Sequence, residues 1–279
     1  AFDEYHPERL LFFAQIIIVD RPQTIQITVV QPDIIWENIP ANLERLEKII
    51  AGIPPQTDII ILPEMFNTGF SMNPETLSEK PGSRTYSWMA ETARGKNSAV
   101  CGSYIVEEDG LYFNRWLFVS PDGSTFRYDK RHLFSPGNED RLFKKGEERV
   151  VFSFRGIRIC PTVCYDLRFP VWSRNRNDYD LLINSANWPR SRRDVWLTLL
   201  KARAIENQCF VAGANRTGTD GTGTEYCGDS LIIGPRGEII ASDTMNKECL
   251  ITATVSLMEL DQFREKFPVL GDGDEFLIL

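Results

Sequence analysis

Apolar residues along the chain fall into short runs of β-branched side chains, separated by stretches with helical spacing. Residues 24–30 and 59–62 are rich in isoleucine and valine and predict buried strands. Between them, apolar residues recur at helical spacing over 43–50 and predict a surface helix. Further strands are predicted at 99–106, 111–119, 125–128, 157–163, 181–185, 210–214, 230–233, 238–241 and 249–255, and further helices at 83–94 and 192–207. This alternation predicts a single α/β domain with mixed sheets.

Turn and helix signals refine this pattern. Residues 107–110 (EEDG) contain a turn signal that joins two strands into a hairpin. Pro161 fits poorly inside a strand ladder, so the strand is expected to fray or bulge there. The run that contains Pro170 is expected to begin a helix. The glycine-rich stretch 218–223 lacks the lysine and the strand–helix context of a phosphate-binding loop, which favours a flexible loop.

Composition excludes several classes of protein. The chain has 279 residues, 42% of them hydrophobic and 25% charged, as in an ordinary soluble globular protein. The formal net charge of −8 argues against nucleic acid or a membrane as a partner, because either favours a basic surface. Six cysteines are too few for a disulfide framework and complete no metal-binding pattern. We therefore expect reduced thiols, a cytoplasmic protein, and no metal or organic cofactor.

Residues 1–23 stand apart from this pattern. Residues 10–19 are apolar apart from Gln15, a stretch too short to span a bilayer. It has no basic leader and no small-residue cleavage site, so a signal peptide is not expected. Three interpretations stay open: an arm packed on the domain, a subunit contact, or a start codon assigned too far upstream. We divide the chain into an extension at 1–23 and a domain at 24–279.

Three predicted strands are followed closely by a reactive side chain: Glu64, Lys130 and Cys164. Cys164 lies at a strand-to-helix turn, where a nucleophile points out of the sheet and feels the positive end of the next helix. Both effects are expected to favour a thiolate. A lone cysteine is more often buried and inert. A glutamate, a lysine and a cysteine at three strand ends instead predict a joint site.

Five segments carry a family resemblance. They are 62–70 (LPEMFNTGF), 129–134 (DKRHLF), 164–170 (CYDLRFP), 186–189 (ANWP) and 202–208 (ARAIENQ). In this order and spacing they resemble the carbon–nitrogen hydrolase (nitrilase) superfamily, and most closely its ω-amidase-like branch. The resemblance implies a four-layer α-β-β-α sandwich with two mixed sheets, and a homodimer or higher homo-oligomer.

The resemblance also implies a reaction. Cys164 is the expected nucleophile, and Glu64 is the base that takes its proton and later activates water. Lys130, with the backbone N–H after Cys164, is expected to stabilise the tetrahedral intermediate. Glu139 matches the place of a second family glutamate that orients the lysine and the substrate. For that place, Asp140 or a plain solvated loop charge remains an alternative.

His132 is the alternative base, because cysteine–histidine pairs are the commoner thiol chemistry. It lies two residues beyond Lys130, so on an extended segment its side chain would share the face of the lysine. We favour a hydrogen-bonded structural histidine instead.

A short ω-amide acid carries its carboxylate only a few atoms from the scissile carbon, so a cation must lie close to Cys164. Arginine suits this task because its guanidinium can contact both carboxylate oxygens in one plane. The candidates are Arg168, one helical turn beyond the nucleophile, and Arg190, after the segment 186–189. The alternative for Arg168 is an ion pair with Asp166 or a neighbouring acid. Two aromatic residues, Tyr165 and Trp188, are predicted to complete the substrate site.

The predicted function is an amidohydrolase that releases ammonia from the terminal amide of a small 2-oxo dicarboxylic acid, such as 2-oxoglutaramate. Its expected partners are the amide and water. Nitrile hydrolysis and N-carbamoyl hydrolysis use the same triad and stay open as alternatives. A non-catalytic binding protein with this fold is the remaining alternative, and the intact triad argues against it.

Overall fold

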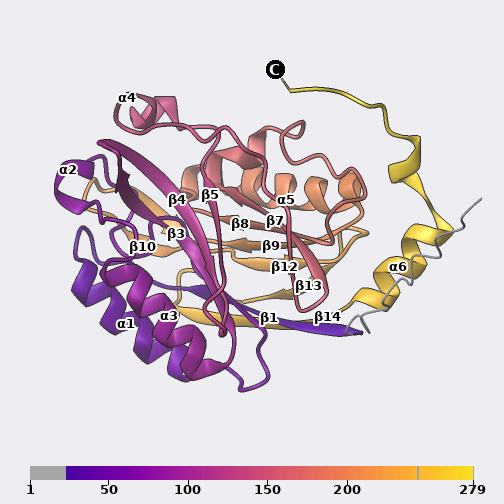
Figure 1. Ribbon diagram of the computed structural model, residues 1–279, viewed down its shortest axis with the longest axis horizontal. Helices are drawn as coiled ribbons and strands as arrows, with labels where there is room; N and C mark the ends of the chain where they lie inside the picture. The colour runs from indigo at the N-terminus through magenta and orange to yellow at the C-terminus, as the bar shows by residue number, and fades with distance from the viewer. Residues whose placement is uncertain (1–22, 244, 279) are drawn as a thin grey trace, which may run out of the picture.

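The computed structural model describes residues 23–243 and 245–278, so the predicted extension lies outside the described residues except for Gln23. Two six-stranded sheets lie face to face (Figure 1). The first contains β1 (Thr24–Gln31), β2 (Ile59–Ile61), β3 (Ala99–Glu108), β4 (Leu111–Val119), β5 (Thr125–Asp129) and β14 (Cys249–Ser256). The second contains β6 (Phe152–Phe154), β7 (Ile157–Val163), β8 (Leu181–Ser185), β9 (Phe210–Ala214), β12 (Leu231–Ile233) and β13 (Ile239–Ser242).

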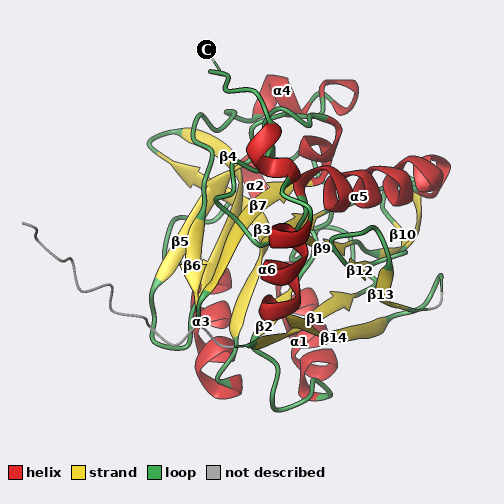
Figure 2. Cartoon of the chain, turned by 90° about the vertical axis from the view of Figure 1, so that its right-hand side faces the viewer, coloured by secondary structure: helices red, strands yellow, loops and turns green. Residues whose placement is uncertain are grey.

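Helices cover the outer face of each sheet. Helices α1 (Ile39–Ala51) and α3 (Arg84–Lys96) pack on the first sheet, and α5 (Arg193–Asn207) packs on the second (Figure 2). The result is the expected four-layer α-β-β-α sandwich. The remaining helices are α2 (Pro74–Leu77), α4 (Glu139–Leu142) and α6 (Leu257–Lys266), with 3₁₀ turns at Ser135–Gly137, Cys164–Arg168, Arg190–Arg192 and Val269–Asp272.

The layered arrangement explains the apolar runs of the sequence. On β1, Ile25, Ile27 and Val29 face the second sheet, whereas Val30 faces the helices on the other side. A strand covered on both faces needs apolar side chains at nearly every position. On α1, Leu43, Leu46 and Ile50 form the buried face. Among the described residues, no helix is both long enough and apolar enough to span a bilayer.

Topology brings distant strand ends to one edge. In the first sheet the order is β14-β1-β2-β3-β4-β5, with β2 and β3 parallel and two antiparallel steps from β3 to β5. Strands β2 and β5 therefore point the same way. In the second sheet, of order β13-β12-β9-β8-β7-β6, strands β7 and β8 are parallel. The Ser185 hydroxyl at the end of β8 donates to the Leu62 carbonyl after β2 at 2.8 Å, which joins the two sheets at this edge.

Two local predictions around the nucleophile are wrong. The register of β7 with β8 runs through Pro161 without a bulge. The proline is tolerated because β6 pairs only as far as Ile159. The helix expected from Pro170 is absent from the described chain at that point, where a 3₁₀ turn over Cys164–Arg168 is followed by bends. The buried Asp166 carboxylate closes this turn by accepting from the Val163 N–H at 2.9 Å.

Candidate active site

Glu64 follows β2 and is fully buried. Its Oε1 atom accepts from Lys130 Nζ and from Asn114 Nδ2, both at 2.8 Å. Its Oε2 atom accepts from the Asn187 backbone N–H at 3.0 Å. Each carboxylate oxygen thus has a donor, as a buried charge requires.

Lys130 follows β5, and its ammonium group lies between two carboxylates. Nζ is 2.8 Å from Glu64 Oε1 and 2.8 Å from Glu139 Oε2. Burial disfavours the ammonium, but the charges of Glu139 and Glu64 outweigh burial and raise the pKa of Lys130, so the side chain is cationic. The Gly146 N–H fixes this segment by donating to the Lys130 carbonyl at 2.9 Å. A Cβ at Gly146 would lie 2.0 Å from the Asp129 carbonyl oxygen, so only glycine permits this approach.

Glu139 opens α4 and is fully buried, whereas Asp140 is exposed. The structure therefore brings Glu139, and not its neighbour, to Lys130. Its Oε2 atom also accepts from the Phe134 N–H at 2.6 Å, which ties the loop to the site. Burial raises the pKa of the Glu139 carboxyl, and the opposing effect of Lys130 does not cancel the rise.

Cys164 has a left-handed backbone with φ of 45° at the turn after β7. A non-glycine residue in this region is strained, and such strain is frequent at functional sites. Its Sγ lies 3.9 Å from the Asn187 carbonyl oxygen. Burial and then the charge of Glu64 raise the pKa of the thiol, against the lowering effect of Lys130. The raised pKa favours a neutral resting thiol over the expected thiolate, because burial and the charge of Glu64 both oppose the charged form.

The other cysteines contrast with Cys164. All six are free thiols, as the sequence predicts. Cys160 lies on β7, the strand that precedes Cys164, and is buried among apolar residues such as Leu182 and Val211. Burial raises its pKa to about 12, with no catalytic group among its hydrogen-bond partners. Cys160 is therefore an inert thiol within the core.

His132 belongs to a hydrogen-bond network around Asp166, in the turn that begins at Cys164. Its Nδ1 atom lies 2.8 Å from Asp166 Oδ1, and its ring stacks on Phe169 at a centroid distance of 3.8 Å. The Asp166 carboxylate also accepts from the Tyr128 hydroxyl at 2.7 Å. These contacts support a structural histidine. They also occupy Asp166, which is therefore not the partner of Arg168.

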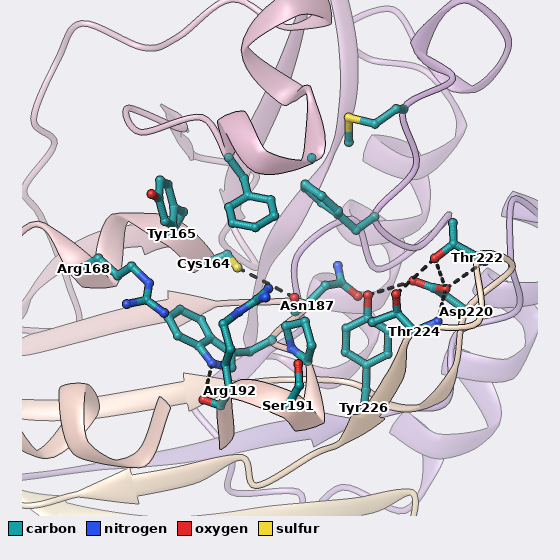
Figure 3. Close-up of a pocket in the computed structure, with 16 residues that line it drawn as sticks. Cys164, Tyr165, Arg168, Asn187, Ser191, Arg192, Asp220, Thr222, Thr224 and Tyr226 are labelled. Carbon is teal, nitrogen blue, oxygen red and sulfur yellow. Dashed lines mark hydrogen bonds between the residues drawn. The ribbon is translucent and has the colours of Figure 1, made fainter. Parts of the chain in front are cut away.

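A cavity of about 370 Å³ opens above Cys164 (Figure 3). Its walls combine aromatic rings with a few polar groups, contributed by Phe70, Phe134, Tyr165, Asn187, Trp188 and Tyr226 among others. Tyr165 and Trp188 were predicted at the substrate site, and both line the cavity. An apolar cavity with few polar groups is typical of a small-molecule site.

Two arginines, Arg168 and Arg192, line the same cavity (Figure 3). The Arg168 guanidinium lies 5.2 Å from the centroid of the Trp188 ring, and that of Arg192 lies 5.3 Å from the Phe134 ring. Within the described ranges, no carboxylate forms an ion pair with either one. Arg190 differs: it is exposed, pairs with Glu225 at 3.1 Å and hydrogen bonds to Asn246. It does not line the cavity, so the geometry does not support its predicted substrate contact.

The glycine-rich stretch 218–223 begins in β10 (Thr217–Thr219) and continues into the loop of a hairpin, whose second strand is β11 (Glu225–Cys227). Asp220 organises the turn, accepting from the Thr222 and Thr224 N–H groups at 2.9 and 3.0 Å and from the Tyr226 hydroxyl at 2.8 Å. The hairpin is one wall of the cavity.

Sequence reasoning missed Asn114, Asn187 and Arg192. Asn114 bears a recognisable signal, because a polar amide interrupts the apolar run 111–119. Asn187 lies inside the segment 186–189, yet its contacts depend on the opposite sheet. Its Nδ2 atom donates to the Glu64 carbonyl at 2.6 Å.

Several known proteins are similar to this chain in sequence and in fold. A family model for carbon–nitrogen hydrolases matches residues 26–265. The chain is 46% identical over 252 residues to Omega-amidase YafV of Escherichia coli (strain K12), covering 90% of this chain and 98% of the relative. It is 34% identical over 251 residues to 2-oxoglutaramate amidase of Bacillus subtilis (strain 168), with coverages of 88% and 96%.

A solved structure of the same family has a similar fold. XC1258 from Xanthomonas campestris, a CN-hydrolase superfamily protein with an arsenic adduct in its active site, has a TM-score of 0.89 at 39% identity. The match covers 92% of this chain and 100% of that one. The chain therefore belongs to the carbon–nitrogen hydrolase family and is an amide-hydrolysing enzyme.

Proposed function

We propose that this enzyme is an ω-amidase that hydrolyses the terminal amide of a small 2-oxo dicarboxylic acid through a thioester on Cys164. The observation that carries the proposal is the buried cluster of Glu64, Lys130 and Glu139 beside a thiol, below a cavity lined by two arginines that form no ion pair within the described residues. The names of the E. coli and B. subtilis relatives support the ω-amide and 2-oxoglutaramate as the substrate class.

Acylation begins from the neutral thiol, because the pKa of Cys164 is raised. Glu64 takes the thiol proton as sulfur attacks the amide carbon, so an S–H bond breaks and an S–C bond forms. Lys130 and the Tyr165 backbone N–H stabilise the oxyanion. The C–N bond then breaks, and the leaving nitrogen takes the proton from Glu64 to depart as ammonia.

Deacylation repeats these steps with water as the nucleophile. Glu64 removes a proton from a water molecule that attacks the thioester carbon, and Lys130 again faces the oxyanion. Collapse of the intermediate breaks the C–S bond, and the sulfur recovers the proton from Glu64. Arg168 and Arg192 hold the carboxylate at the far end of the substrate, because a guanidinium can donate to both of its oxygens.

Ammonia release from a panel of amides tests the proposal. The panel contains 2-oxoglutaramate, succinamate, an uncharged amide of similar length, a nitrile and an N-carbamoyl amino acid. We expect the charged ω-amides to have the highest kcat/KM, and an acid quench to trap an acyl group on the peptide that contains Cys164. A preference for the nitrile or the N-carbamoyl compound would contradict the ω-amidase proposal. An adduct on Cys160 would contradict the nucleophile assignment.

A further inference from the structure

Asn114 lies on β4, next to Lys130. Strands β4 and β5 are neighbours (Figure 1), and their ladder pairs Arg115 with Asp129. The Lys130 N–H continues this ladder by donating to the Asn114 carbonyl at 3.0 Å. Residues directly opposite on antiparallel strands share a face of the sheet. The Asn114 carboxamide is therefore placed beside the ammonium, and it is fully buried.

The carboxamide uses both of its N–H bonds on the catalytic carboxylates. Nδ2 donates to Glu64 Oε1 at 2.8 Å and to Glu139 Oε1 at 2.9 Å. Lys130 Nζ lies 2.8 and 3.1 Å from the same two oxygens. Two oxygens of two different carboxylates are thus held between one neutral and one charged donor.

In this orientation the amide oxygen of Asn114, Oδ1, is buried and has no hydrogen-bond partner in the part of the chain that the structure describes. A flipped amide would point this oxygen at the carboxylates and lose both donations. Unsatisfied buried polar atoms are rare and need an explanation, and here the two glutamates supply it.

The two oxygens of Glu64 are not equivalent. Oε1 already accepts two hydrogen bonds, from Lys130 and from Asn114. Among the described nitrogen donors, only the Asn187 N–H reaches Oε2, at 3.0 Å. The carbonyl oxygen of Asn187 lies 3.9 Å from Cys164 Sγ, so Oε2 is on the side of the nucleophile.

We propose that Asn114 is a positioning residue that assigns the two oxygens of Glu64 to different tasks. Together with Lys130 it occupies Oε1, which leaves Oε2 to accept the proton of the Cys164 thiol. This inference rests on the proposed function, in which Glu64 is the base. Asn114 itself is not among the residues that line the cavity.

Loss of the carboxamide has two consequences. The proton can then move to Oε1, away from the reacting sulfur. The Glu139 carboxylate also loses a donor that favours its charged form, so it holds a proton up to a higher pH and no longer balances the charge of Lys130 there. The enzyme should therefore lose activity at the acid end of its working range.

The test is the pH profile of Asn114→Ala with 2-oxoglutaramate. We expect kcat near neutral pH to fall at least about tenfold, because a lost hydrogen bond to a charged group is worth that much or more. We expect KM to stay within about twofold, since Asn114 does not line the cavity. The acid limb of kcat/KM should move up by about one pH unit.

Asn184→Ala is the matched control. Asn184 is equally buried, and its Oδ1 also lacks a partner among the described residues. Its Nδ2 donates to the Thr162 hydroxyl at 2.9 Å and not to Glu64 or Glu139. It should lower thermal stability without moving the acid limb. Asn114→Asp is the second variant. Aspartate has nearly the same shape as asparagine, so this variant tests the inference if Asn114→Ala does not fold. Its neutral carboxyl can donate once, so its activity should fall as pH rises and the carboxyl ionises.

An unshifted acid limb in folded Asn114→Ala would overturn the inference, as would an Asn114→Asp variant that is fully active at alkaline pH. An equal shift in Asn184→Ala would also overturn it, because the effect would then be structural. Glu64→Gln separates this failure from that of the proposed function. If Glu64→Gln is active, the proposed function fails; if it is inactive while Asn114→Ala has a normal profile, only the inference fails.

Discussion

Two regions of the site balance charge differently: the buried cluster next to Cys164, here called the floor, and the arginines that line the cavity, here called the mouth. On the floor, Glu64, Lys130 and Glu139 are fully buried, and their charged atoms donate to or accept from one another. At the mouth, Arg168 and Arg192 are half-buried, and their guanidinium groups lie near aromatic rings.

This difference separates reaction from recognition. Burying three charges is tolerable only when they compensate one another, and this arrangement also fixes their geometry before the substrate arrives. A guanidinium on an aromatic ring keeps its N–H donors available for a ligand. The floor is therefore expected to govern kcat for every amide, and the mouth to govern which amide is accepted.

Variants of the floor should have the largest effects. Cys164→Ala should abolish turnover in a folded protein. Glu64→Gln and Lys130→Ala should each lower kcat by several orders of magnitude, roughly the loss seen when one member of a catalytic set is removed. The double variant should be little worse than either single one, because the groups act as a unit. Steady-state kinetics would contradict this mechanism if His132→Ala were inactive and Glu64→Gln active.

Variants of the mouth should discriminate between substrates. Arg168→Ala and Arg192→Ala should each lower kcat/KM for 2-oxoglutaramate by roughly 2–4 kcal/mol of transition-state binding, because each removes a charge-assisted hydrogen bond to the carboxylate. Activity on an uncharged amide of similar length should be nearly unchanged. Equal losses on both substrates would assign the arginines a structural role and remove the basis for carboxylate recognition.

Alkylation of Cys164 tests how the floor controls its thiol. The Glu64 charge raises the pKa of this thiol, so Glu64→Gln should lower that pKa and increase the thiolate fraction at neutral pH. Iodoacetamide should then label Cys164 about tenfold faster, the change expected for one pKa unit, in a variant that has lost turnover. Slower labelling would mean that Glu64 activates the resting thiol directly.

Arg190→Ala should have the smallest effect and is the control for the mouth. Arg190 is exposed and paired with Glu225, outside the cavity. Exposed ion pairs contribute about 0–1 kcal/mol, so neither stability nor substrate preference should change by more than that. A selective loss on charged amides, measured beside Arg168→Ala, would restore the substrate contact that the sequence alone suggested.

Local sequence was sufficient for most strands of both sheets and for the strand ends that carry Glu64, Lys130 and Cys164, but not for β6, α6 or the 3₁₀ turn after β7. Runs of β-branched residues mark strands covered on both faces, and this property depends only on neighbouring positions. Glu64, Lys130 and Cys164 were recognisable because each closely follows such a run. Glu139 required the family pattern, because its loop has no periodicity of its own.

The tertiary structure decided the features that depend on neighbours distant in sequence. Asn114 reaches Glu64 across 50 positions, and Asn187 reaches it across 123 positions and from the opposite sheet. The choice of Arg192 over Arg190 depends on the direction of a short 3₁₀ turn, which spacing does not fix. The protonation of Cys164 depends on burial and on the charge of Glu64 in three dimensions. Sequence therefore determined which groups are present, and folding determined their partners and their charge.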